Sequence, residues 1–459
     1  MGNKLSLFCA IAIASLLIRT APSTAQMGPL RAGAARVDVS PTPNMFPMTG
    51  MQSFGALHDP LYARALILDN GSNKVALVTV DSVGIVSGDE LINTLANELK
   101  IPATNLILSA THDHNTPLEL SGGFLPGTGP ATKSPYFEIL KEGLLKAVRQ
   151  ADANLQPARV GFGTGKAYVN TNRNWNIDEN IHGFYNPEGP SDKTVAVLVV
   201  TNLSGEPFAI YTNYAVHSVV MFQSKTRDGI GEVTGDLAGW TSNYVEDHIK
   251  GVVALWTMGA AGDQNPLFMS LYNQAAPGIH DEGPSGWAIL DVLARRLGEE
   301  TVRVSKSIQN TTGEVALWGM QTSAACPGRK PAEPFQFAAV GSFLTGAFWD
   351  KFKMVDSEPT KIPLQLIMVN DIAIAGVSGE VFTEIGQHFK RDSLFDRAFM
   401  VTNLPGGAGF YIPTDAGYLI PVSETRSNRI KPGCAEQAII GGFQSMQKSY
   451  LPVWQKSSK

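Results

Sequence analysis

Apolar runs that lead directly into polar loops constrain the fold of this chain more than any other feature. Short runs rich in Val, Leu and Ile recur along the sequence, and several are followed at once by Asp, His or Glu. Runs of this length and composition are typical of buried strands. Two pairs of runs flank strong turn signals, Asp69-Asn70-Gly71-Ser72 and Asn202-Leu203-Ser204-Gly205, which predict β-hairpins. The expected strands are 63–68, 74–80, 105–109, 194–201, 208–215, 252–257, 363–369 and 372–376.

Helices are expected between these strands. The stretch 136–151 carries apolar residues at helical spacing, with Phe137, Leu140, Leu144 and Val148 on one face. Strands that alternate with helices indicate an α/β fold, with mixed sheets and flanking helices. The other expected helices are 90–99, 236–249, 287–305 and 381–390.

Composition indicates the size of the core and excludes one class of partner. The chain has 459 residues, of which 44% are hydrophobic and 17% are charged, enough for a large buried core. We expect residues 26–459 to form one large domain. The net charge of −5 is spread along the chain without basic runs, so nucleic-acid binding has no electrostatic support.

Residues 1–25 are typical of a cleaved leader. Lys4 supplies a positive charge, residues 5–18 are almost wholly apolar, and Ser23-Thr24-Ala25 resembles a small-residue cleavage site. A membrane anchor is the alternative, but the apolar stretch is shorter than the ~20 residues that cross a bilayer. The start Met1-Gly2 also matches the myristoylation pattern. We expect a signal peptide, and hence a secreted or periplasmic protein with no stable membrane span after cleavage.

Two cysteines remain beyond this leader, which contains Cys9. Cys326 and Cys434 belong to no CxxC motif or Cys/His cluster, which argues against zinc-finger and thiol-redox chemistry. In an exported protein they could form one disulfide, but the sequence does not show that they meet.

The tripeptide His112-Asp113-His114 follows the expected strand 105–109. In an extended segment, residues two apart project to the same face, so both imidazoles could converge on one point. A neutral imidazole is a good metal ligand, and a His-x-His pair at a strand end commonly places two of them. The alternative is that the histidines only cap the strand through hydrogen bonds.

His217 and Glu380 also follow expected strands. Alone, His217 could be an interior histidine with satisfied hydrogen bonds, and Glu380 could lie at the start of the next helix. Together with His112 they supply two histidines and one carboxylate. Such a set can hold a catalytic zinc and leave a position open for water.

Three aspartates at strand ends or helix starts are candidates to orient these histidines. A carboxylate that accepts the second ring N–H of a ligand fixes the tautomer and the ring direction. Each aspartate could equally cap a helix. The three are Asp81, Asp236 and Asp263.

The order of several motifs resembles the neutral/alkaline, non-lysosomal ceramidase family. The likeness runs from about Ala32 to about Tyr418 and depends on the whole series, not on any single motif. The motifs are 32–41 (AGAARVDVSP), 58–64 (HDPLYAR), 109–114 (SATHDH), Asn172-Arg173, 214–217 (YAVH), Gly235-Asp236, Gly262-Asp263, Gly379-Glu380 and 411–414 (YIPT).

This resemblance implies a ceramidase-like catalytic domain over residues 26–459, with a zinc site at the C-terminal ends of strands. The zinc ligands that it implies are His112, His217, Glu380 and Tyr411.

The resemblance also implies roles for two further residues. His114 would donate or accept a proton at the scissile group, and Arg173 would bind the substrate or its developing oxyanion. Without the resemblance, Arg173 could belong to a surface salt bridge, and Tyr411 could be an aromatic packed beside Phe410.

The sequence departs from the family at three places. Where family members carry a serine in a Gly-Asp-x-Ser-Pro segment, this chain has Asn265. Asparagine excludes a covalent serine route at this position, although Asn265 could donate a hydrogen bond to the substrate. A family tyrosine beyond the Tyr411 motif has no clear equivalent, and Tyr418 lies closest. We also expect the C-terminal β-sandwich domain of the family to be absent.

The combined reading is an exported zinc-dependent amide hydrolase that cleaves the N-acyl bond of ceramide, or of a related N-acyl lipid, by metal-activated water. Two alternatives stay open. One is a zinc hydrolase of a different amide or ester. A shallow polar cleft beside the zinc would favour this alternative, whereas a long apolar cleft would favour a lipid. The other is a non-enzymatic exported binding protein, which loss of a zinc ligand would suggest.

Overall fold

The structure is a computed structural model that describes most of the chain. The described residues are 26–121, 132–178, 181–183, 185–224, 230–270, 284–332, 353–407, 409–420, 422–426 and 428–457. The predicted leader, 1–25, lies outside them.

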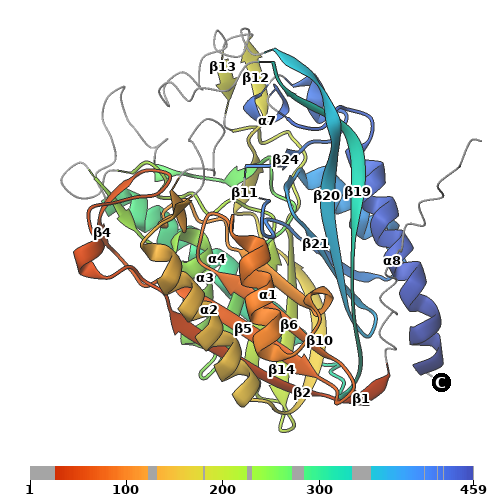
Figure 1. The fold of residues 1–459 in the computed structure, drawn as a ribbon. Coiled ribbons are helices and arrows are strands. Elements are labelled where there is room, and N and C mark those ends of the chain that lie inside the picture. Colours follow the sequence, from red (N-terminus) through yellow and green to blue (C-terminus); the bar gives the residue numbers. More distant parts are fainter. Residues whose placement is uncertain are drawn as a thin grey trace, which may run out of the picture.

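Two β-sheets form the frame of the molecule (Figure 1). The first has eight strands in the order β17-β15-β14-β10-β2-β5-β6-β7, and the second has five in the order β1-β19-β20-β21-β23. The strands of the first sheet are β2 (Arg31–Asp38), β5 (Tyr62–Asp69), β6 (Lys74–Val80), β7 (Leu106–Ala110), β10 (Gln156–Lys166), β14 (Thr194–Asn202), β15 (Pro207–Tyr214) and β17 (Val253–Met258). Those of the second are β1 (Met27–Pro29), β19 (Glu314–Pro331), β20 (Met354–Val369), β21 (Ile372–Val377) and β23 (Arg397–Val401).

Both sheets mix parallel and antiparallel pairs. The pairs β6–β7, β15–β17 and β21–β23 run parallel. The predicted hairpins are present as the antiparallel pairs β5–β6 and β14–β15, and each turn has a glycine in the left-handed region, Gly71 at φ 80° and Gly205 at φ 86°. Glycine adopts this conformation without the steric clash of a Cβ atom.

The sheets pack face to face because the side chains of both alternate between two apolar environments. Leu66 and Leu77 of the first sheet share one buried cluster with Ile367 and Ile374 of the second. Their neighbours along the strands point the other way, toward helices. This burial on both faces explains why the strands read as continuous apolar runs.

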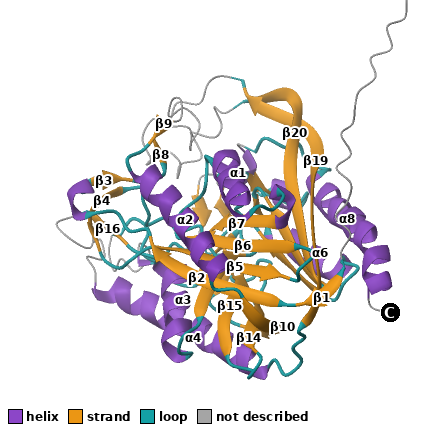
Figure 2. Ribbon diagram, turned by 60° about the horizontal axis from the view of Figure 1, so that its bottom comes forward, coloured by secondary structure: helices purple, strands orange, loops and turns teal. Residues whose placement is uncertain are grey.

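Helices cover the outer faces of the two sheets (Figure 2). Helices α1 and α2 pack on β5 and β6, α3 and α4 pack on β14 and β17, and α6 and α8 cover the second sheet. Their bounds are α1 (Gly88–Leu99), α2 (Tyr136–Ala153), α3 (Asp236–His248), α4 (Pro284–Ser307), α6 (Thr383–Asp392) and α8 (Ala435–Ser457). Among the described residues, no helix combines the length and the apolar character needed to cross a membrane.

Short strand pairs occupy the loops that leave the sheets. The antiparallel pair β11 (Asn170–Asn172) and β18 (Gln264–Pro266) and the parallel pair β22 (Glu380–Val381) and β24 (Tyr411–Ile412) contain residues that the sequence singled out. The remaining short strands are β3 (Met48–Thr49), β4 (Ser53–Leu57), β8 (Leu120–Ser121), β9 (Thr132–Lys133), β12 (Trp175–Asp178), β13 (Ile181–Gly183) and β16 (Gly231–Val233).

The expected fold class is confirmed: mixed sheets with flanking helices, and polar residues at strand ends. Each predicted strand and helix is present, most with shifts of a few residues at their ends, but the strand predicted at 363–369 is the end of the longer β20, which begins at Met354. The long strands β10 and β19 were not predicted. Beyond Met320, β19 contains no continuous buried run, because exposed positions lie between the buried ones. It therefore lacks the apolar run by which the other strands were predicted.

Cys326 and Cys434 form a disulfide, which the sequence had left open. Their Cα atoms are 5.7 Å apart, and the bond closes a loop of 108 residues. Cys326 belongs to β19 and Cys434 immediately precedes α8, so the bond fixes the start of this last helix against the second sheet.

Replacing both cysteines by alanine is expected to lower the free energy of unfolding by about 2–5 kcal/mol, because a long loop then gains freedom in the unfolded chain. Urea unfolding of the parent and of the Cys326→Ala/Cys434→Ala double variant, without reductant, measures the change. Reductant should shift the parent toward the variant and leave the variant unchanged. An unfolding midpoint equal to that of the oxidised parent would contradict this expectation.

Candidate metal centre

His112 lies two residues beyond the end of β7 and is buried. Its backbone has φ 61°, in the left-handed region, so the expectation that both histidines share one face of an extended segment is wrong. The direction of the His112 ring is set by this left-handed turn, and not by the alternation of side chains along a strand. The Nδ1 atom lies 2.7 Å from the carbonyl oxygen of Val83, and because a carbonyl only accepts, Nδ1 carries the proton and Nε2 keeps its lone pair.

His217 lies beyond β15 and reaches the same place from another loop. Its Nδ1 atom is 2.9 Å from the carbonyl oxygen of Gln264, which fixes the same tautomer as in His112. The two rings meet edge to face, with centroids 4.5 Å apart. A bridge between Asp113 and Ser218 joins the two loops that carry these histidines.

Glu380 completes the group from the short strand β22, in the segment that follows β21 of the second sheet. Its Oε2 atom lies 3.2 Å from Nε2 of His112 and 3.2 Å from Nε2 of His217. The other carboxylate oxygen accepts the backbone N–H of Gly409. The carboxylate is therefore oriented by the protein, with one oxygen directed at two imidazole nitrogens.

These three side chains fit a small divalent metal ion. Two imidazole lone pairs and a carboxylate oxygen face one point, and Oε2 of Glu380 is a buried atom without a hydrogen-bond partner among the described residues. Four ligands at zinc distances in a tetrahedron stand about 3.3 Å apart, close to the separations seen here. Nε2 of His112, Nε2 of His217 and Oε2 of Glu380 are all acceptors, so a cation bound between them would remove their mutual repulsion.

The electrostatics favour the metal-binding forms of these groups. Burial lowers the pKa of His217 to about 3, and the nearby Arg173 acts in the same direction, so the imidazole is neutral at pH 7. Burial alone would raise the pKa of Glu380, but His112 and His217 hold it well below its usual value. A neutral imidazole and an ionised carboxylate are the forms that bind metal.

His114 lies beside the same group, as predicted for the second histidine of the motif. Its Nε2 atom is 3.3 Å from Nε2 of His112, and ligand atoms of His112, His114 and His217 all lie within 4.8 Å of one another. Phe222 packs edge-on against its ring, with centroids 5.0 Å apart. Burial and the neighbouring histidines hold its pKa well below the usual value. The position suits a fourth metal contact or a base beside the metal.

Tyr411 and Arg173 border the group, and the β22–β24 ladder places Tyr411 opposite Glu380. The Arg173 guanidinium donates to the Tyr411 hydroxyl at 3.0 Å and to the carbonyl of Gly262 at 2.9 Å, and it pairs with Glu424 at 2.8 Å. Arg173 is thus an anchor at the centre, with 12% of its side chain exposed. The reading of Arg173 as a surface salt bridge is therefore wrong.

Asn265 lies on β18, next to β11, and its Oδ1 accepts from Nη1 of Arg173 at 3.2 Å. The Asn265 amide therefore belongs to the hydrogen-bond network around Arg173. The same Nη1 atom of Arg173 lies 3.4 Å from Nε2 of His217. Tyr418 is oriented differently. Its hydroxyl donates to the carbonyl of Ile430 at 2.8 Å, so it is held by that loop.

The three aspartates bind backbone or other side chains. Asp81 pairs with the buried Arg64 at 3.1 Å, and Asp236 accepts the backbone N–H groups of Val220, Met221 and Leu237. Asp263 accepts the N–H of Thr383 at the start of α6, which is the capping alternative. The acceptors for the ring N–H groups of His112 and His217 are instead backbone carbonyls.

Two further residues of the site escaped the sequence reading. Asn403 follows β23, which was not predicted, and its amide contacts His112. Glu424, on the short helix α7 (Ser423–Arg426), pairs with Arg173. Asn403 could have been found from the sequence, because Thr402-Asn403 follows an apolar run, as the other polar residues of the site do. Nothing in the sequence near Glu424 distinguishes it from other surface acids.

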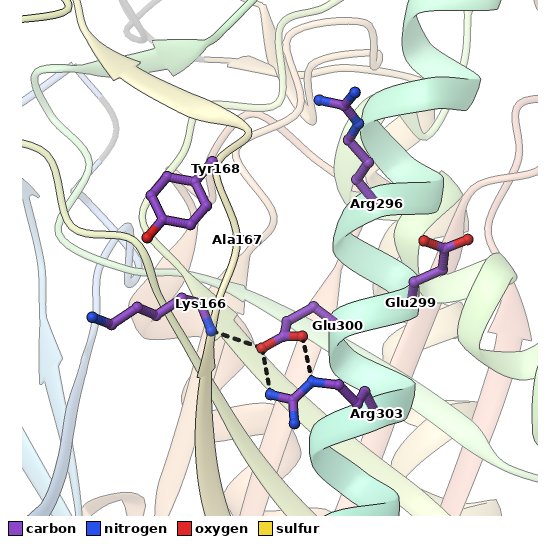
Figure 3. Close-up of a pocket in the computed structure, with 7 residues that line it drawn as sticks. All are labelled: Lys166, Ala167, Tyr168, Arg296, Glu299, Glu300 and Arg303. Atoms are coloured by element: carbon purple, nitrogen blue, oxygen red, sulfur yellow. Dashed lines mark hydrogen bonds and ion pairs between the residues drawn. The ribbon is translucent and has the colours of Figure 1, made fainter.

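A separate open pocket lies where β10 meets α4 (Figure 3). Glu300 there pairs with Arg303 at 2.7 Å and accepts the backbone N–H of Lys166 at 2.7 Å, so its charge is balanced locally. None of its lining residues belongs to the histidine group.

Comparison with known proteins gives the family. The family model for "Neutral/alkaline non-lysosomal ceramidase, N-terminal" matches residues 31–280, which are more than half of the chain. The chain belongs to the neutral/alkaline non-lysosomal ceramidase family. The resemblance seen in the sequence is therefore confirmed.

Individual relatives are distant. Neutral ceramidase of Pseudomonas aeruginosa is 26% identical over 287 residues, which cover 57% of this chain and 41% of that protein. Neutral ceramidase B of Dictyostelium discoideum is 26% identical over 257 residues, covering 51% of this chain and 34% of that protein. The matched part thus spans less than half the length of these curated relatives.

Solved ceramidase structures share the fold. The crystal structure of the Pseudomonas aeruginosa enzyme aligns with a TM-score of 0.65 at 17% identity, over 93% of this chain and 75% of that one. A ceramidase complexed with C2 aligns with a TM-score of 0.63 at 16% identity, over 91% and 74%.

The depressed pKa of His217 predicts how acid affects the metal-free chain. Its folded pKa of about 3 lies below the ordinary histidine pKa of 6.5, so this group contributes stability that is present above pH 6.5 and is lost as pH falls toward 3. Unfolding of the parent and of His217→Gln in urea, both with chelator, isolates this contribution. The advantage of the parent should shrink by about 4 kcal/mol across that window. A difference that does not change with pH would contradict the assignment.

Proposed function

We propose that this chain is an exported zinc-dependent amide hydrolase that cleaves the N-acyl bond of ceramide or of a related N-acyl lipid. The observation that carries the proposal is the convergence of His112, His217 and Glu380 from loops of two sheets. Family membership, with relatives named neutral ceramidase and a relative's structure complexed with C2, supports the substrate class.

His112, His217, Glu380 and Tyr411 would hold the zinc. When bound, it would supply Lewis-acid polarisation of the substrate carbonyl and a lowered pKa for water. The protein's own contribution is to keep His217 neutral and Glu380 ionised, and to aim all three side chains by hydrogen bonds on their far sides.

His114 is the proposed proton carrier. Its lowered pKa keeps it neutral at pH 7, so it can accept a proton from the attacking water. As the water oxygen bonds to the acyl carbon and the C–N bond breaks, the same imidazole returns that proton to the leaving nitrogen. The products are a carboxylic acid and a free amine.

Arg173 and Asn265 would orient the substrate. The Nη1 group of Arg173 lies between His217 and Asn265, next to the place where negative charge grows on the substrate oxygen. Because Asn265 directs its Oδ1 toward Arg173, its amide N–H₂ group is the part it can offer to a substrate. This arrangement supports direct hydrolysis, since asparagine offers no nucleophile.

Export is part of the proposal. Structural disulfides form and persist in oxidising compartments, and the Cys326–Cys434 bond therefore supports a secreted or periplasmic location. The leader-like composition of residues 1–25 supports the same location.

The test combines metal analysis with a substrate panel. The chain without residues 1–25 is purified, its zinc content is measured, and it is assayed on ceramide, an N-acyl amino acid, an N-acyl amino sugar and a matched ester. Turnover of ceramide that chelator removes and zinc restores is the expected result. Zinc-dependent turnover of another panel member alone would reassign the substrate, and a zinc-loaded protein inert on the whole panel would favour a binding role.

A further inference from the structure

Asn403 lies between the two segments that bring ligands from different sheets. Its backbone N–H donates to the carbonyl of Gly379 at 3.2 Å, directly before Glu380. Its own carbonyl accepts the N–H of Ala110 at 3.4 Å, two residues before His112. A single buried residue is therefore bonded to both ligand segments.

The side chain of Asn403 contacts the far side of the His112 ring. Its Nδ2 atom donates to the carbonyl of Val83 at 2.8 Å and lies 2.9 Å from Nδ1 of His112. Nδ1 itself lies 2.7 Å from the same carbonyl. Because a carbonyl oxygen has two lone pairs, that of Val83 can accept from both groups. Since Nδ2 of Asn403 and Nδ1 of His112 are both donors, the two side chains are linked through the Val83 carbonyl, which accepts from both and so restrains the plane of the imidazole.

The backbone of both residues is held in an uncommon conformation. Asn403 has φ 57° and His112 has φ 61°, in the left-handed region that only a few per cent of residues other than glycine adopt. Such conformations persist where surrounding contacts over-determine them, and they concentrate at functional sites. Here the backbone of Asn403 is held by its bonds to Gly379 and Ala110, and its side chain donates to the Val83 carbonyl, which also accepts from His112.

We propose that Asn403 is a positioning residue that sets the direction of the His112 lone pair toward the metal. The inference rests on the proposed metal site. The amide of Asn403 fixes the Val83 carbonyl, the carbonyl fixes the Nδ1 proton, and Nε2 is thereby aimed at the point shared with Glu380. Groups that orient a metal-bound histidine in this way commonly contribute about 10–100-fold to metal affinity.

The variant Asn403→Gly tests the side chain alone. Glycine accepts a positive φ without strain, so the backbone bonds to Gly379 and Ala110 can persist. A second variant, Asn403→Asp, keeps the size of the side chain but replaces the amide donor by a carboxylate oxygen that repels the Val83 carbonyl.

Asn370 provides a matched control in the turn between β20 and β21. It also has a left-handed backbone, at φ 55°, and it is buried. Its Oδ1 accepts from Ala316 at 2.7 Å and its Nδ2 donates to the carbonyl of Glu314 at 3.1 Å. Asn370→Gly therefore removes comparable hydrogen bonds from a place outside the site.

The readouts are Zn²⁺ affinity by chelator competition, the visible absorption of the Co²⁺-substituted protein, and stability in urea. Both Asn403 variants are expected to bind Zn²⁺ about 10–100-fold more weakly and to show an altered Co²⁺ spectrum. Asn370→Gly should lose stability but keep the affinity and spectrum of the parent. Parental affinity and spectrum in Asn403→Gly, or equal losses of affinity in Asn403→Gly and Asn370→Gly, would overturn the inference. These readouts need no substrate, so a parent that binds zinc but leaves ceramide intact would overturn only the proposed substrate.

Discussion

A His112→Ala variant is expected to lose its metal and its amidase turnover together. The side chain contributes one of two imidazole nitrogens that lie 3.2 Å from the Glu380 carboxylate, and alanine offers no replacement. Loss of the metal removes several kcal/mol of transition-state stabilisation, so kcat/KM should fall by roughly 10³-fold or more. Metal analysis of the purified variant, beside an assay with added zinc, measures both effects.

His248→Ala is the matched control for this experiment. His248 lies on α3 and also directs Nδ1 at a backbone carbonyl, that of Tyr244, at 2.7 Å, but it is exposed and outside the histidine group. It should keep parental zinc and turnover. If His112→Ala retained a full equivalent of zinc and parental kcat/KM, the assignment of the centre would be wrong.

An Arg173→Lys variant is expected to lower kcat by roughly 10²–10³-fold while the protein stays folded and metal-loaded. The guanidinium spans two directions at once, with one nitrogen toward Tyr411, Gly262 and Glu424 and the other toward Asn265. A lysine ammonium is one compact donor and cannot occupy both positions. Steady-state kinetics on the preferred panel substrate, with metal analysis of the same sample, measures the loss.

The Glu424→Gln variant distinguishes the role of the Glu424 ion pair, which holds Arg173 in place, from the role of the Arg173 guanidinium itself. Glutamine keeps an oxygen that can accept from Arg173 but removes the negative charge that pairs with it at 2.8 Å. A much smaller loss of kcat is expected than in Arg173→Lys. Equal losses in the two variants would show that Arg173 acts through this ion pair, and not at the substrate.

The sequence was sufficient for the fold class and for three of the proposed ligands because both leave local signals. Buried strands read as continuous apolar runs, and His112, His217 and Glu380 each follow one directly. Their convergence, by contrast, depends on long-range packing. The reasoning from an extended His-x-His was wrong in its geometry, because the left-handed turn at His112 directs its ring.

Other parts of the centre depend on contacts that no local pattern contains. Tyr411 is placed by a two-residue ladder with Glu380, and only the family resemblance pointed to it. Ring orientation depends on the carbonyls of Val83 and Gln264, and every residue has a carbonyl, so composition cannot single these out. Asn403 follows the five-residue strand β23, and its contact with His112, far away in the sequence, is formed only in the folded chain.

The division of the ligands between two sheets has a consequence for how the molecule comes apart. His112 and His217 are carried by loops of one layer and Glu380 by a loop of the other, so an ion shared among them would bind only while the layers are in contact. Its binding free energy would then add to the work of separating them, and it would grow with the concentration of free metal. Chelation should consequently lower the melting temperature of the whole sandwich, in addition to stopping the chemistry at one end of it.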